Sequence, residues 1–269
     1  MIKSTSPFRP LVLRVAMVMS VGAALAGCGA FDFRNDRPSD KNAAAGLTPA
    51  QVAPALRLAR ATRANGDLAS AISLYRSVTA IQPADPAVVV ELGDTLVDAN
   101  SMDDAIDAYN RVDQKSPAWL DALLGLEQVY LALAEPAKAL EYADKANALS
   151  PQDHRVGIGR GVALDMLGRH TEAQECYRAV LNAAPRDVAA RNNLALSLAM
   201  TKQFDEAIQI MTSMARSSTA TPRIRQNLAL IYGLAGDAER AAALSRVDLD
   251  APATEANLRF FAFARDAKN

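Results

Sequence analysis

A spacing of 34 residues recurs along this chain of 269 residues and restricts it to a repeat architecture. The spacing is visible in two columns of residues: Ala71, Ala105, Ala139, Ala173, Ala207 and Ala241, and Pro83, Pro117, Pro151 and Pro185. Alanine is too common here to decide the matter, but the chain has only 13 prolines. Three successive prolines at one spacing have a chance on the order of 10⁻⁴ for a given starting proline. The sequence therefore predicts repeated units of constant length.

Each unit has the composition of two α-helices joined by a short turn. Alanine-rich sequence between short stretches with glycine or proline favours helix along the chain. Between the two expected helices stands a residue that tolerates the positive φ often needed in tight turns. These residues are Gly66, Asn100, Gly168 and Gly236. The periodicity therefore predicts an all-α fold of helical hairpins.

The pattern resembles the tetratricopeptide repeat (TPR), a helix–turn–helix unit of 34 residues with small residues where its helices meet. The clearest copy reads Gly66-Asp67-Leu68-Ala69-Ser70-Ala71-Ile72 and is followed by Tyr75 and Pro83. The resemblance implies a right-handed superhelical array of about six repeats within residues 48–251. The repeats that it implies are 52–85, 86–119, 120–153, 154–187, 188–221 and 222–251.

A stack of repeats must have its last apolar surface covered. Residues 252–269 are expected to supply a C-terminal capping helix for this purpose. The apolar residues of this helix are Leu258, Phe260, Phe261 and Phe263.

Residues 1–27 have the pattern of a signal peptide. Lys3, Arg9 and Arg14 provide positive charge without any acidic residue, and the stretch 11–26 is mostly apolar or small. That stretch is too short to span a bilayer as a stable helix. We therefore expect residues 1–27 to be removed from the mature protein.

The end of this segment, Leu25-Ala26-Gly27-Cys28, resembles the lipobox of bacterial lipoproteins, whose cysteine becomes the acylated first residue. The resemblance implies lipidation at Cys28 and, with Gly29 next to it, a lipid-anchored location at the periplasmic face of the outer membrane. Residues 28–47 lack periodicity and are expected to act as a flexible tether. An ordinary secretory signal that contains Cys28 by chance is the alternative.

The short tether, the unbroken repeat register and the runs 225–237 and 257–261 are together similar to the TadD family of tight-adherence (Flp) pilus assembly. This resemblance implies a scaffold or pilotin that binds the pilus secretin or another pilus component. Two alternatives stay open. One is a type IV pilus pilotin of the PilF/PilW kind, and the other is an envelope adaptor for peptidoglycan hydrolases or barrel assembly.

Charge and motifs argue against nucleic acid binding and against catalysis. The net charge of −1 provides no general basic surface for phosphate groups. The glycine-containing run 157–161 lies in an expected helix and follows no strand, so it does not predict a nucleotide site. His154 and His170 are too far apart for a local metal pair, and Cys176 is interpreted as a packing residue rather than a reactive thiol. We expect a protein partner, no enzymatic activity, and no cofactor or metal.

The first helices of TPR units line a concave groove, and the repeat register identifies their inward positions. These positions are Val90, Asp94, Val97, Leu124, Gln128, Leu131, Ile158, Val162, Met166, Asn192, Leu196, Met200, Gln226 and Leu230. Most are apolar, which favours a groove for an amphipathic helix or an extended apolar segment. TPR proteins that clamp acidic C-terminal peptides use lysine and asparagine there, so that ligand type is disfavoured. The alternative is that several of these residues are buried between neighbouring helices.

Overall fold

The computed structural model describes residues 47–81 and 84–266, and every regular element in this part of the chain is an α-helix. The predicted signal peptide, the lipidation site Cys28 and nearly all of the predicted tether lie outside the described residues. The described chain divides into two compact units between Leu133 and Ala134. We call them the N-terminal unit and the C-terminal unit, and each is considered by itself.

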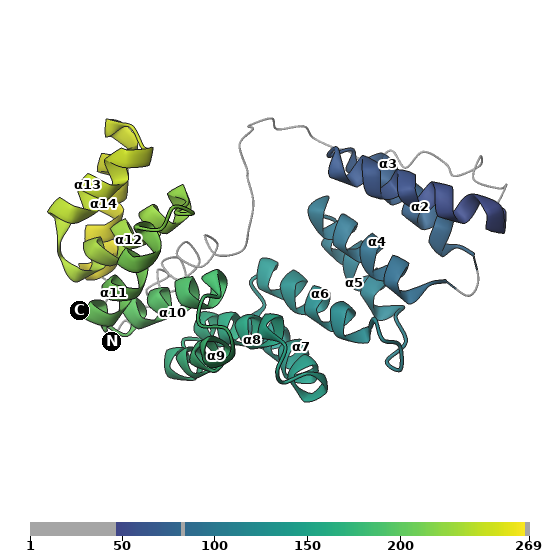
Figure 1. Cartoon of the computed structure of the whole chain (residues 1–269), viewed down its shortest axis with the longest axis horizontal. Coiled ribbons are helices and arrows are strands. Elements are labelled where there is room, and N and C mark those ends of the chain that lie inside the picture. The colour runs from purple at the N-terminus through teal and green to yellow at the C-terminus, as the bar shows by residue number, and fades with distance from the viewer. Residues whose placement is uncertain (1–46, 82–83, 267–269) are drawn as a thin grey trace, which may run out of the picture. The chain divides into compact units, whose positions relative to one another are not determined.

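The N-terminal unit contains five of the described helices (Figure 1). They are α2 (Pro49–Ala64), α3 (Leu68–Thr79), α4 (Pro86–Asp98), α5 (Met102–Asn110) and α6 (Trp119–Ala132). Each helix packs on the next one along the chain, and α4 also packs on α6. At the start of α2, Thr48 is the N-cap, Pro49 is the first helical residue, and the Thr48 backbone N–H donates to Gln51 Oε1 at 2.8 Å.

The C-terminal unit contains eight described helices (Figure 1). They are α7 (Pro136–Leu149), α8 (His154–Met166), α9 (His170–Ala183), α10 (Val188–Met200), α11 (Phe204–Ala215), α12 (Pro222–Ala235), α13 (Ala238–Asp248) and α14 (Ala251–Asp266). Consecutive helices pack as hairpins, and α8, α10 and α12 also contact one another in that order. The predicted all-α fold built from helical hairpins is therefore confirmed.

Positive φ angles recur at the inter-helix turns with the predicted spacing. Gly66, Gly168, Gly236 and Asn100 have φ values of 83°, 77°, 91° and 58°. The same column includes Ala134 at 56° and Lys202 at 63°, which the sequence did not mark. Six turns therefore share one left-handed conformation at intervals of 34 residues, although only four of them carry a residue that favours it.

Large aromatic rings fill the space between helices where a partner helix has only glycine. The Tyr109 ring lies between Gly93 of α4 and Gly125 of α6 so closely that a Cβ at either glycine would overlap it. Tyr177 of α9 packs against Gly161 of α8 in the same way. Both tyrosine side chains are almost completely buried. The glycines are therefore needed for close packing, which is a steric requirement distinct from the positive φ at the turns.

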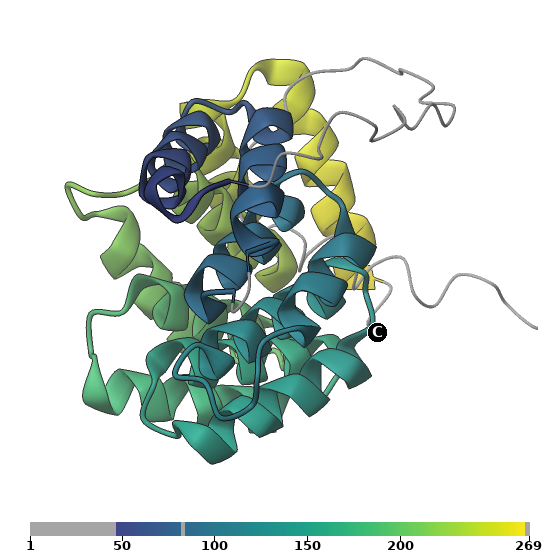
Figure 2. The ribbon, with the colours of Figure 1, turned by 90° about the vertical axis from the view of Figure 1, so that its right-hand side faces the viewer.

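The predicted capping helix is α14, the yellow helix that packs on α12 and α13 (Figure 1, Figure 2). Phe261 is 4% exposed and lies against Gly233 of α12, so it covers the end of the stack as expected. Phe263 is 60% exposed and does not contribute to the covering side. Two residues along an α-helix correspond to about 200° of rotation, so Phe261 and Phe263 point in nearly opposite directions.

Candidate functional site

The structure places the fourteen predicted groove residues on the first helices of the hairpins, but it does not expose them equally. Those that are buried are Val90, Leu131, Val162, Asn192 and Leu230. Those that are half-buried are Asp94, Val97, Leu124, Ile158, Met166, Leu196, Met200 and Gln226, while Gln128 is exposed. Only the second and third groups present a side chain to a partner in this conformation.

In the C-terminal unit the candidate site is built on three first helices that run side by side. Ile158 and Met166 come from α8, and Leu196 and Met200 come from α10. Gln226 and the buried Leu230 come from α12. Within each helix these residues are four or eight apart, so they lie on one side of that helix. We call this set, together with Val162, the C-terminal face.

The three helices run in the same direction, as contacts near both ends of α8 and a contact between equivalent positions of α10 and α12 indicate. His154 Nδ1, at the start of α8, lies 3.9 Å from an Asp187 carboxylate oxygen at the start of α10. Near the other end of α8, Asp165 is bonded to Ser197 of α10. Asn227 of α12 donates to Asn192 of α10 at 2.7 Å, and the two residues occupy similar positions in their helices, the sixth and the fifth. The first turns of α8, α10 and α12 therefore lie along one edge of the C-terminal face.

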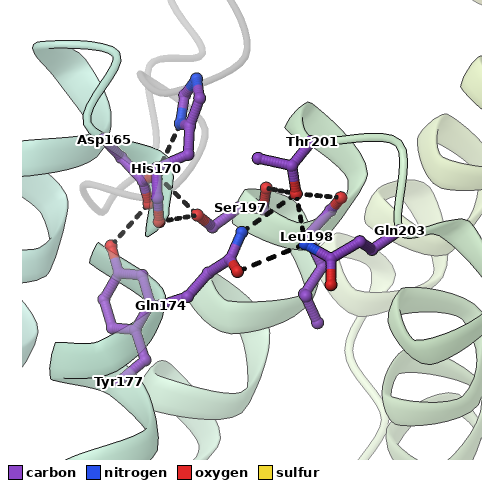
Figure 3. Close-up of polar contacts among 8 residues, drawn as sticks. All are labelled: Asp165, His170, Gln174, Tyr177, Ser197, Leu198, Thr201 and Gln203. Atoms are coloured by element: carbon purple, nitrogen blue, oxygen red, sulfur yellow. Dashed lines mark hydrogen bonds and ion pairs between the residues drawn. The ribbon is translucent and has the colours of Figure 1, made fainter. Parts of the chain in front are cut away.

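A buried carboxylate joins the helices beneath this face (Figure 3). Asp165 is 6% exposed. It accepts hydrogen bonds from the Tyr177 hydroxyl at 2.9 Å and the Ser197 hydroxyl at 2.7 Å. His170 Nδ1 lies 2.8 Å from Asp165 Oδ1. Since a buried carboxylate is stable only when its oxygens are well partnered, this cluster fixes α8, α9 and α10 relative to one another.

A second polar cluster continues the first along α9 to α11 (Figure 3). The Gln174 amide donates to Thr201 Oγ1 at 3.1 Å, and the Gln203 amide donates to the same oxygen at 2.8 Å. The Thr201 hydroxyl in turn donates to the Leu198 carbonyl at 3.0 Å. These polar groups therefore form hydrogen bonds with one another at the C-terminal end of α10. The neighbouring face then presents mainly apolar side chains.

The repeat register predicted that Asn192 contacts a partner, but its side-chain amide is hydrogen-bonded to neighbouring residues. It accepts from Asn227, and its own Nδ2 donates to Asn193 Oδ1 at 3.1 Å. Asn192 and Asn227 are each only 1% exposed. In this conformation the asparagines join α10 to α12 and offer no free polar group.

The first helices of the N-terminal unit have a more acidic surface. Asp94 is half-buried and accepts from the Tyr109 hydroxyl at 2.8 Å. Burial raises the pKa of Asp94, and the negative charges of Asp98 and Asp121 raise it further, while the Tyr109 hydrogen bond lowers it. Asp98 is paired with Arg63 of α2 at 2.8 Å. These helices thus combine the apolar Val97 and Leu124 with several carboxylates.

A surface cleft of about 400 Å³ lies apart from the predicted groove, between α7, α8 and α9. Gly157 and Cys176 are among its lining residues, and Arg160 Nη1 lies 3.2 Å from Cys176 Sγ. Burial raises the pKa of the Cys176 thiol, which the nearby Arg160 partly offsets. A raised thiol pKa disfavours the nucleophilic thiolate, in agreement with the interpretation of Cys176 as a packing residue.

Within residues 47–81 and 84–266, no group of three or more His, Cys, Asp or Glu side chains could hold a metal ion. Among the described helices, none is both long enough and apolar enough to cross a membrane. The glycine-containing run 157–161 is helical, and Gly161 serves to admit the Tyr177 ring.

Sequence comparison identifies the repeats independently of the helices. Residues 62–127 and residues 158–222 each match the tetratricopeptide repeat family. The fold is similar to a crystal structure of a tetratricopeptide repeat protein from Parabacteroides merdae, with a TM-score of 0.55 and 17% identity over 79% of this chain and 99% of that one. A thermophilic TPR protein from Thermus thermophilus gives a TM-score of 0.56 and 20% identity over 67% of this chain and 98% of that one. The chain therefore contains tetratricopeptide repeats, and the fold of its described part is of the TPR type.

Two curated relatives have related sequences but are longer than the matched part. An uncharacterised protein, y4yS, of Sinorhizobium fredii is 36% identical over 98 residues, which are 36% of this chain and 54% of that protein. Cellulose synthase 2 operon protein C of Komagataeibacter xylinus is 28% identical over 244 residues, which are 89% of this chain and 16% of that protein. This chain therefore spans about half of the first relative and a small part of the second.

Proposed function

We propose that this protein is a non-enzymatic scaffold whose C-terminal face binds a segment of another protein. The observation that carries the proposal is the combination of half-buried apolar residues with polar neighbours that, Gln226 Oε1 excepted, are hydrogen-bonded within the protein. Ile158, Met166, Leu196 and Met200 reach the surface from adjoining parallel helices. The polar groups beside them, above all Asp165, are bonded internally. Such a surface gains free energy by burying apolar area and loses little by desolvation of polar groups.

The methionines suit this role because their side chains are unbranched and adapt to differently shaped partners. The helices beneath them are held by buried hydrogen bonds, so little backbone entropy would be lost on binding. A few apolar anchors then supply most of the affinity, as in other protein interfaces.

We further propose that the protein works as an outer-membrane lipoprotein, anchored through Cys28 at the periplasmic face. The support is the lipobox-like ending Leu25-Ala26-Gly27-Cys28 after an apolar segment, followed by a short non-periodic tether. The similarity to the TadD family favours a pilotin or scaffold of Flp (tight-adherence) pilus assembly that binds the pilus secretin. A pilotin of the PilF/PilW kind or an adaptor for peptidoglycan hydrolases or barrel assembly uses the same docking surface with another partner.

A second candidate is a docking role in a cellulose-synthase system. It is favoured by the similarity of 89% of this chain to part of Cellulose synthase 2 operon protein C. The neighbouring genes separate the candidates: pilus ATPase and secretin genes favour the first, cell-wall genes the adaptor, and cellulose-synthase genes this one.

The docking role is tested by the double substitution Leu196→Glu with Met200→Glu. Both side chains are half-buried, so the change places two charges on the proposed surface without opening the core. We expect at least about ten-fold weaker partner recovery in a crosslinking pull-down from membranes, because each apolar anchor contributes roughly 1 kcal/mol or more. Leu230 is unsuitable for this test because it is only 5% exposed and its substitution would disturb folding.

The matched control is Val247→Glu, which adds a charge at a residue of α13 that is 63% exposed. Circular dichroism should show equal helicity for both variants. Full partner recovery with the Leu196/Met200 variant would show that the partner does not bind at the C-terminal face.

A further inference from the structure

The C-terminal face has a charged edge whose sign restricts what can bind to it. Arg155 and Val162 on α8 are seven residues apart, as are Arg223 and Leu230 on α12. Seven residues are close to two helical turns, so each arginine lies on the same side of its helix as the apolar residue. Both arginines are in first turns, which lie along the edge described above.

The two arginines differ in how far their charge is already balanced. Arg155 is paired with Asp153, the N-cap of its own helix, at 2.7 Å. Arg223 is exposed, and the N-cap of its helix is the neutral Thr221. Arg225 on the same turn is paired with Asp248. Arg223 therefore places at this edge a positive charge that no acidic N-cap balances.

The two carboxylates described at this edge are engaged locally: Asp153 pairs with Arg155, and Asp187, the N-cap of α10, accepts from the Ala190 backbone N–H. Asp165, next to Met166, is 6% exposed, and its oxygens accept from Tyr177 and Ser197 with His170 adjacent. The corresponding first helices of the N-terminal unit, in contrast, carry Asp94, Asp98 and Asp121. A negatively charged ligand is thus favoured at the first surface and opposed at the second.

We infer that the segment bound by the C-terminal face is amphipathic and acidic, with apolar side chains on Ile158, Met166, Leu196 and Met200 and carboxylates beside Arg155 and Arg223. The inference rests on the proposed docking function and adds the charge and orientation of the ligand. It requires no free terminal carboxylate, because the arginines stand at one edge and the middle of the face is apolar. A peptide with an amidated C-terminus should therefore bind as well as one with a free C-terminus.

The test is selection from a library of random 12-residue peptides displayed on phage, with the full-length chain immobilised through its C-terminus. Sequencing should show enrichment of peptides that combine Leu, Ile, Phe or Met with an excess of Asp and Glu. Selected peptides, synthesised with amidated C-termini, are then measured by fluorescence anisotropy at low and high salt. The double variant Arg155→Glu with Arg223→Glu should bind them roughly ten-fold more weakly at low salt, and the difference should shrink at high salt.

The matched control is Arg216→Glu with Arg246→Glu, which changes the net charge equally at two exposed arginines following or within second helices. Its affinity for the selected peptides should equal that of the unmodified chain. Enrichment of basic or uncharged apolar peptides, or equal binding by the Arg155/Arg223 variant, would overturn the inferred charge while leaving the docking face in place. Failure to enrich any peptide, or binding that survives Leu196→Glu with Met200→Glu, would overturn both the charge and the docking face.

Discussion

Glu127 is the least expected residue of the buried set. In the repeat register it takes the position of Gly93 and Gly161, where a small residue normally lets two helices approach. The side chain is nevertheless 5% exposed, and burial raises its pKa to about 8. A carboxyl group in such surroundings stays protonated in the folded chain at pH values where it would ionise in the unfolded chain.

The stability of the fold should therefore fall as the pH rises from about 5 to about 8. The folded state holds the Glu127 proton over this range and the unfolded state does not, so deprotonation favours unfolding. Glu127→Gln removes the titration, and its melting temperature should exceed that of the unmodified chain at pH 8 by much more than at pH 5. Thermal melts across this range measure the difference. Equal pH profiles for the two proteins would contradict the raised pKa, and the exposed Glu175→Gln serves as the control.

At the scale of helices, tight pairs of one ring and one glycine set the distances within hairpins. Tyr177 is fully buried, its ring fills the space above Gly161, and its hydroxyl bonds to Asp165 at 2.9 Å. Ring and carboxylate together position α9 on α8. The hairpin therefore has one preferred spacing, which the rows of smaller residues around it could not specify alone.

Gly161→Ala tests this packing because its expected effect on stability is opposite to the effect that helix propensity predicts. Alanine is normally the better helix former by roughly 1 kcal/mol, but here its Cβ would overlap the Tyr177 ring. We expect destabilisation of about 1–3 kcal/mol in urea unfolding. In a Tyr177→Leu background the same change should cost far less, since the ring is gone. Additive effects of the two substitutions would show that the ring and the glycine do not constrain each other.

The helices were predictable because proline, alanine and turn residues recur at one spacing, and this spacing is independent of side-chain detail. The turns at Ala134 and Lys202 escaped prediction because neither residue favours the positive φ that it adopts. Register also gave the direction in which Val162 and Leu230 point, but it could not show that neighbouring helices cover both. The Asp165 cluster was missed because Ser197 comes from the next repeat and no short motif joins it to Asp165 and His170.

At the scale of the whole chain, the proposed function requires that the C-terminal face be presented from a lipid-anchored location. The C-terminal face belongs to the described C-terminal unit, while the predicted signal peptide and Cys28 lie outside the described residues. The anchor is thus inferred from sequence, and the docking surface from the arrangement of α8, α10 and α12.

Cys28→Ala separates the two parts of this account. Loss of lipidation should leave the helices intact, because the described helices begin at Pro49, and should release the protein from the outer membrane. Membrane fractionation and circular dichroism measure the two effects. A variant that remains in the outer-membrane fraction would show that Cys28 is not the anchor.

Site-specific photo-crosslinking in cells tests the central claim most directly. A benzoylphenylalanine at Met200, on the C-terminal face, should form a crosslink to one partner protein, identified by mass spectrometry. The same group at Val247, on an exposed part of α13, should form none. Crosslinks from position 247 with none from position 200 would show that the partner binds elsewhere, and the account of the C-terminal face would then be wrong.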